Sequence, residues 1–105
     1  MPRQDFHWAL LIPTSHLCVR DNPALSRFEL DANGVTAVSY YTLAGGVMTF
    51  THTEVPPQAR GGGIASRLIA GALEAARARG LKIVVRCPFV GAYLGKHPEF
   101  NDLLV

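Results

Sequence analysis

The stretch Gln58-Ala59-Arg60-Gly61-Gly62-Gly63-Ile64-Ala65-Ser66-Arg67 decides the fold, because it joins a predicted strand to a predicted helix. The strand covers residues 47–55, and the helix is predicted from about Arg60 to Arg79. The first N–H groups of a helix have no partner within the helix and carry a partial positive charge. Glycine lets a ligand approach this backbone closely, since it has no Cβ. The stretch therefore predicts an anion site, and phosphate is the usual anion.

The glycine spacing excludes two common phosphate-binding loops. A P-loop requires Lys followed by Ser or Thr after its last glycine, and no such pair follows here. A dinucleotide-binding loop requires a third glycine at position 66, which is serine. Arg60, Gly63 and Ala65 instead fit the pattern R-x-x-G-x-A. The simpler alternative is a glycine-rich turn that only leads into a helix.

The R-x-x-G-x-A loop resembles the acyl-CoA pyrophosphate loop of the GNAT N-acetyltransferase superfamily. The flanking segments 51–81 and 86–98 resemble a small single-domain branch of that superfamily, and the resemblance covers about residues 20–104. It implies acetyl-CoA or coenzyme A as a cosubstrate, bound between two strands that splay apart around the pantetheine arm. The residues that the resemblance places at this cosubstrate are Thr53, Val55, Arg60, Gly61, Gly62, Gly63, Ile64, Ala65 and Ser66.

The other segments predict a small mixed domain. Residues 24–30, 35–43 and 47–55 predict three antiparallel strands joined by short turns. Residues 81–86 predict a fourth strand, which pairs parallel to the third because a helix lies between them. A second helix is predicted at about 89–96. The fold class is therefore α/β (α+β), a minimal GNAT-like fold of about four mostly antiparallel strands with one parallel, splayed pair and two helices.

Length and composition predict one globular domain. The chain has 105 residues, of which 49% are hydrophobic, enough for one core. The net charge is +2 and the basic residues are spread along the chain, so nucleic acid is not an expected partner. The histidines and cysteines lack zinc-ligand spacing, so no metal is expected. We expect a monomer or a homodimer.

Residues 1–20 are interpreted as an N-terminal extension whose structure the sequence does not decide, ahead of an acyl-CoA-binding domain at 21–105. Trp8 is a candidate to pack on that domain. The apolar run 9–12 ends at Pro13 and is too short for a signal peptide or a membrane span. We therefore expect a cytoplasmic protein with no membrane partner. Both of its cysteines, Cys18 and Cys87, are expected to be reduced.

Glu54 and His52 are the candidate bases for amine deprotonation, which acetyl transfer to an amine requires because a lysine amine is mostly charged at neutral pH. The two residues are two positions apart on one strand, so both point to the same face of the sheet. The alternative is that Glu54 is a solvated charge at the strand end and that His52 packs with Met48 and Phe50.

Tyr93 and Cys87 are candidates for the thiolate end of the reaction. Tyr93 matches the superfamily position at which a tyrosine often protonates the CoA thiolate, and the alternative is a core tyrosine. Cys87 stands at the end of the fourth strand, where it can accept the acyl group, although a buried, inert cysteine is the better interpretation. Arg60 and Arg67 are two helical turns apart and can screen the charge of a pyrophosphate.

The sequence thus predicts an acetyl-CoA-dependent N-acetyltransferase that works by direct attack of an amine. A non-catalytic module for CoA binding or protein interaction is the competing hypothesis, because so short a chain can lack the helices that hold an acceptor. A nucleotide-phosphate binder is a weaker third hypothesis. A protein lysine, a free N-terminus, a polyamine and an antibiotic all fit as acceptor.

Overall fold

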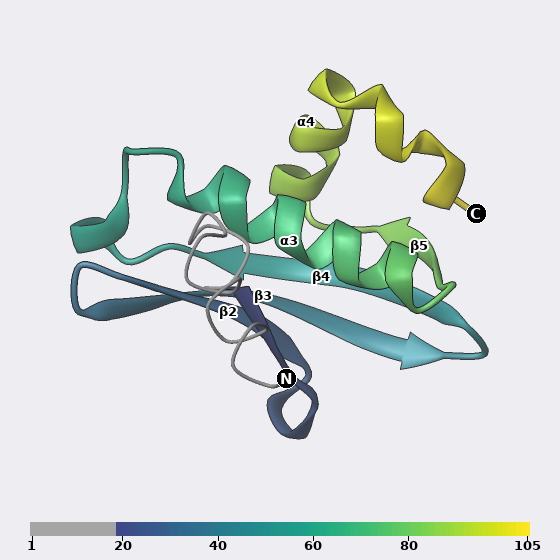
Figure 1. The fold of residues 1–105 in the computed structure, drawn as a ribbon, viewed down its shortest axis with the longest axis horizontal. Helices are drawn as coiled ribbons and strands as arrows, with labels where there is room; N and C mark the ends of the chain where they lie inside the picture. The colour runs from purple at the N-terminus through teal and green to yellow at the C-terminus, as the bar shows by residue number, and fades with distance from the viewer. Residues whose placement is uncertain (1–18) are drawn as a thin grey trace, which may run out of the picture.

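The computed structural model describes residues 19–105, which form a five-stranded sheet with two α-helices on one of its faces (Figure 1). The strands follow one another in chain order across the sheet, and all neighbours are antiparallel except the last two. The elements are β1 (Val19–Asn22), η1 (Pro23–Leu25), β2 (Arg27–Ala32), β3 (Val35–Ala44), β4 (Val47–Glu54), η2 (Pro57–Ala59), α3 (Ile64–Ala78), β5 (Lys82–Val85), α4 (Pro88–Lys96) and η3 (Pro98–Leu103). The predicted fold class is confirmed.

The strand β1 is an addition to the predicted sheet, because no clear strand pattern precedes residue 24. It pairs with β2 from Val19–Leu30 to Asn22–Arg27. The Asn22 side chain then accepts a hydrogen bond from the Leu25 N–H and caps the turn η1, so β2 begins three residues later than predicted. The predictions for Trp8 and Cys18 lie outside the described residues.

One core lies between the sheet and the two helices. In α3, the residues at three- and four-residue steps face the sheet, as the apolar stripe predicted. The sheet contributes side chains of alternate positions, and the helices and η3 close the core from above. Its fully or nearly buried members include Phe28, Leu30, Tyr41, Met48, Phe50, Leu68, Ile69, Leu73, Ile83, Val90, Leu94 and Phe100.

A β-bulge at Thr51 changes which face the end of β4 presents. Tyr41 pairs with Phe50, but Tyr40 pairs with His52, so Thr51 is an extra residue on β4. Paired residues share a face, and side chains alternate along a strand. Thr53, opposite the buried Ser39, therefore faces the helices together with Phe50, whereas His52 and Glu54 face the other side of the sheet.

The helix α3 begins at Ile64, four residues later than predicted, since the three glycines before it all have left-handed backbone angles. Its middle lies close to the edge strand β1. A Cβ added at Gly71 would come within 2.7 Å of the Val19 side chain, which is too close for any real contact. The absence of a side chain at Gly71 thus allows β1 to sit under the helix. None of the described helices is long and apolar enough to cross a membrane.

Candidate functional site

The glycine loop leads directly into α3. Gly61, Gly62 and Gly63 have φ angles of 83°, 64° and 75°, and an L-residue in this region is strained. The first backbone bond of the helix runs from the Arg67 N–H to the Gly63 carbonyl, so the N–H groups of residues 64–66 precede the intrahelical pattern. Gly63 is the N-cap and offers no side chain to cap them. The N–H groups at the start of the helix therefore have no capping side chain and can bind an external anion.

Two arginines are tied to this loop. The Arg60 Nε donates to the Val55 carbonyl at 3.0 Å, and the Arg67 guanidinium donates to the Gly62 carbonyl at 3.4 Å. Each of these bonds uses one of the five N–H donors of the guanidinium. Both side chains are exposed at the loop. Hydrogen bonds thus hold both positive charges to backbone carbonyls at or near the loop.

A cavity of about 290 Å³ opens beside the loop, and we call it the loop cavity. The carbon-rich walls come from the end of β4, from η2 and from the first turns of α3 and α4. Seven of the nine residues that the sequence placed at the cosubstrate line it; Gly62 does not, and Thr53 lies elsewhere. The lining residues are Val55, Ala59, Arg60, Gly61, Gly63, Ile64, Ala65, Ser66 and Phe89.

The strands β4 and β5 stop pairing before β4 ends. Their register ends at Phe50–Val85, and the Arg86 N–H makes a last bond to the Phe50 carbonyl at 2.9 Å. The chain then turns into α4 while β4 continues to Glu54. The backbone of residues 51–54 therefore has no partner strand on its β5 side, and the gap begins at the parallel pair, as the resemblance implied.

Thr53 and Cys87 face one another across this gap. The Cys87 thiol donates to the Thr53 Oγ1 at 3.4 Å, and Thr53 Oγ1 lies 3.1 Å from the Ser39 Oγ. Cys87 is 3% exposed, so the thiol is buried at the helix side of the sheet. The three side chains form a short hydrogen-bonded row at the end of the β4–β5 pair.

A second cavity of about 420 Å³ lies at the end of β4, and we call it the strand-end cavity. It shares Val55 and Arg60 with the loop cavity, so the two adjoin. His52 Nε2 lies 3.0 Å from Glu54 Oε2, and both side chains are about 60% exposed. The lining residues are Thr36, His52, Thr53, Glu54, Val55, Pro56, Pro57 and Arg60.

These positions test one of the sequence interpretations. The alternative in which His52 packs with Met48 and Phe50 is wrong, since the bulge at Thr51 turns His52 to the opposite face. His52 instead stacks on Tyr40, with ring centroids 6.4 Å apart. The expectation that His52 and Glu54 share one face is correct.

The match to a family model decides the classification of the chain. Residues 27–103 match the model described as GCN5-related N-acetyl-transferase. The chain belongs to this family. Membership implies acyl transfer in general, and GCN5-related N-acetyltransferases normally use acetyl-CoA as the acyl donor. A search of curated proteins gave no match.

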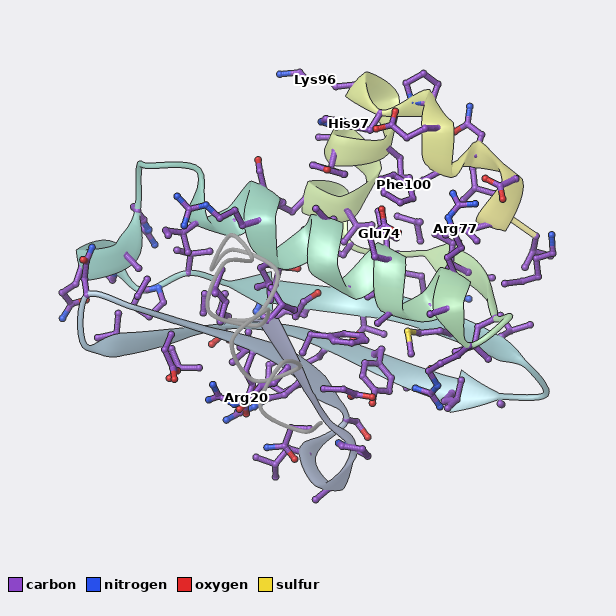
Figure 2. The ribbon with its side chains drawn as sticks, viewed as in Figure 1. Arg20, Glu74, Arg77, Lys96, His97 and Phe100 are labelled. Carbon is purple, nitrogen blue, oxygen red and sulfur yellow. The ribbon has the colours of Figure 1, made fainter. Side chains whose placement is uncertain are left out.

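Tyr93 of this GCN5-related N-acetyltransferase chain is placed away from the two cavity linings. Its ring stacks on His97 with centroids 3.9 Å apart, and Phe100 follows at 6.3 Å. Burial raises the pKa of Tyr93 above the usual value for a tyrosine, and the charges of Glu99 and Glu74 add to the effect. Figure 2 shows His97 and Phe100 on the side of the domain formed by α4 and η3, near Arg77 of α3.

Sequence reasoning missed several residues of the site. Thr36 reaches the strand-end cavity only through the pairing of β3, and Ser39 is buried beside Thr53 for the same reason. Phe89 lines the loop cavity from the first turn of α4 and is 43% exposed. The available signal in the sequence was its position directly after Cys87-Pro88, where the predicted second helix begins next to the end of the fourth strand. Among residues 19–105, no group of three or more His, Cys, Asp or Glu side chains could hold a metal ion.

Proposed function

We propose that the chain transfers an acetyl group from acetyl-CoA to a primary amine. The observation that carries this proposal is the glycine loop, in which three left-handed glycines lead into α3 beside the gap between β4 and β5. The N–H groups of Ile64, Ala65 and Ser66, with Arg60 and Arg67, suit the pyrophosphate of CoA. The apolar loop cavity suits the adjoining part of the same molecule.

The pantetheine arm would occupy the gap beside β4. The backbone of residues 51–54 has unpaired edge positions there, and a buried amide needs a hydrogen-bond partner. An arm that leaves the loop cavity at Val55 and runs along this edge would carry its thioester back along β4, past Thr53. Cys87 faces Thr53 across the gap.

The amine would approach from the strand-end cavity. Glu54 or His52 accepts the amine proton, directly or through water, and the neutral nitrogen attacks the thioester carbonyl. The new C–N bond forms as the C–S bond breaks, and the thiolate leaves with CoA. The nitrogen, positively charged after its attack, gives its second proton to solvent, and Tyr93 or solvent returns a proton to the sulfur. The direct route fits because the two cavities adjoin at Val55 and Arg60.

The alternative function is a CoA-binding module without catalysis. It is favoured by one observation, namely that the Tyr93 ring is held in a stack with His97 and that Tyr93 lines neither cavity. A covalent route through Cys87 is a further alternative, supported by the position of its thiol beside Thr53. Direct transfer predicts an acetylated amine, the covalent route predicts an acetylated protein as well, and the binding module predicts neither.

Three measurements separate them. Calorimetry with CoA tests binding of the cosubstrate, and an amine library with acetyl-CoA tests transfer. Intact mass after mixing with acetyl-CoA alone tests for an acetyl group on Cys87, with Cys87→Ala as control. Direct transfer predicts CoA binding, at least one acetylated amine, no acetylated protein and an active Cys87→Ala variant. Tight CoA binding with no acetylated amine would leave the binding module, and absent CoA binding would end the proposal.

A further inference from the structure

The strand-end cavity has one carboxylate in its lining, that of Glu54. The lining also contains His52 and the cation Arg60, whose guanidinium donates to the Val55 carbonyl. The remaining lining is made of hydroxyl groups, prolines and one valine. A polycation binds well where several carboxylates gather, so the composition of this cavity bears on the acceptor.

A second carboxylate stands behind the wall of the cavity. Asp31 lies opposite Thr36 in the β2–β3 pair, and the Thr36 hydroxyl donates to the Asp31 Oδ1 at 2.7 Å. Arg20 of β1 holds this carboxylate in a two-pronged contact, with N–O distances of 2.9 and 3.2 Å. Such fork-to-fork pairs are directional as well as strong. Asp31 is therefore bonded to the cavity-lining residue Thr36, and the positive charge of Arg20 neutralises its carboxylate.

The next carboxylate along the same face is neutralised as well. Glu29 accepts from Arg27 at 2.6 Å, from Arg20 at 2.8 Å and from Asn22 at 3.0 Å. Glu29 and Asp31 alternate with the core residues Phe28 and Leu30, so both face away from the helices, as do His52 and Glu54. Figure 2 shows Arg20 on this side of the sheet. Glu54 is thus the carboxylate in this row that lacks an arginine partner in the described part of the chain.

We infer that the acceptor is an isolated primary amine of the lysine side-chain type rather than a polyamine, and that Arg20 sets this preference by neutralising Asp31. The inference rests on the proposed function and adds the substrate class. A single ammonium can be placed at Glu54. A second ammonium on the same ligand would meet Arg60, or the Arg20–Asp31 pair, and would gain no free carboxylate among residues 19–105.

The test compares two acceptor amines on the full chain. N-α-acetyl-lysine methylamide presents one ammonium, and spermidine presents three spaced along a flexible chain. Each is titrated into CoA-saturated protein by calorimetry at low salt, and kcat/KM is measured in parallel with acetyl-CoA. The wild type is expected to favour the monoamine in both measurements, because spermidine gains nothing from its extra charges.

Four variants locate the cause. Arg20→Gln releases Asp31 and should shift the preference toward spermidine by about three- to fivefold, the size of one exposed charge pair. Arg20→Lys keeps the charge and should keep most of the preference. Adding Asp31→Asn to Arg20→Gln should restore the wild-type ratio. Pro57→Glu adds a carboxylate at the exposed rim of the same cavity and should shift the ratio without touching Arg20.

The outcomes separate this inference from the proposed function. If neither amine is acetylated but the monoamine still binds preferentially, transfer fails while the acceptor class stands. If wild-type protein binds spermidine as tightly as the monoamine, the acceptor class is wrong even when both are acetylated. An unchanged ratio in folded Arg20→Gln overturns the role of Arg20. An unchanged ratio in Pro57→Glu overturns the claim that the shortage of carboxylates at this cavity sets the preference, whether or not Arg20→Gln folds.

Discussion

The ring of Tyr93 lies on the ring of His97, with centroids 3.9 Å apart and an interplanar angle of 16°. The stack joins α4 to the residue at which that helix ends, and Phe100 of η3 packs against it. The stack holds one face of the tyrosine ring, whereas the hydroxyl, the only polar group of the side chain, takes no part in it. The stack and the hydroxyl can therefore be tested separately.

Tyr93→Phe retains the ring and removes the hydroxyl. If Tyr93 protonates the CoA thiolate, kcat falls by up to about 10²-fold while CoA affinity changes little. His97→Ala disturbs the stack and serves as the control for ring placement. Steady-state kinetics and calorimetry measure the two effects. Normal turnover in Tyr93→Phe would remove the tyrosine from the mechanism.

Gly63→Glu should abolish CoA binding. The substitution adds a carboxylate at the N-cap of α3 and forces a side chain into a backbone with φ near 75°. Gly46→Glu is the matched control, because Gly46 has a φ of 77° in the β3–β4 turn, outside the loop cavity. Calorimetry on both folded variants is the measurement, and equal CoA affinities in the two would rule the loop out.

Glu54→Gln and His52→Ala identify the base. The two side chains lie 3.0 Å apart, so one can act on the amine while the other positions it. The responsible variant should lose about 10²-fold or more in kcat and should lose the ionisation that makes the rate rise with pH. Thr49→Ala, on the paired part of β4, is the control. Two variants with wild-type pH profiles would show that neither residue is the base.

The stability of the domain should fall as pH rises from about 10 to about 12. Burial raises the pKa of Tyr41 from 10.0 to about 12, and its hydroxyl donates to Asp21 Oδ1 at 2.6 Å. The unfolded chain loses this proton near pH 10 and the folded chain only near 12, so alkali favours unfolding in this window. Urea titrations at pH 9 and 11 measure the decline, and Tyr41→Phe should show a smaller one. Equal declines would mean that other groups cause it.

Two helical glycines should respond to alanine in opposite ways. Gly71→Ala brings a methyl group within 2.7 Å of Val19, and overpacking costs about 1–3 kcal/mol, against about 1 kcal/mol gained in helix propensity. Gly95→Ala in α4 meets nothing within 4 Å and should stabilise by up to about 1 kcal/mol. Chemical denaturation gives both values. A stabilised Gly71→Ala would mean that β1 can move away from α3 without loss.

The sequence was sufficient for the main elements and for the loop, since both rest on local signals. Alternation predicts β2, β-branched and aromatic residues predict β3, and β4 follows from the turn before it and the prolines after it. The apolar stripe predicts α3, and the glycine pattern predicts the loop. The start of α3 was missed because three consecutive left-handed glycines delay a helix that composition alone would begin at Arg60. β1 was missed because four residues, Val19–Asn22, are too few to show a period.

The orientation of His52 could not be predicted for a different reason. A bulge depends on how one strand pairs with its neighbour, and nothing in the residues around Thr51 indicates an extra position. Thr36 and Ser39 reach the site through the same pairing. The parts that the sequence did not yield are therefore those set by register between strands.

The bulge at Thr51 also bears on the order of events in a catalytic cycle. Since it turns His52 and Glu54 to the face opposite Phe50 and the helices, we expect the acceptor to approach from that face and the acyl donor from the helix side. Neither molecule would block the path of the other. Initial-rate kinetics should then show random addition of the two substrates, and the acetylated product should be able to dissociate while CoA is still bound.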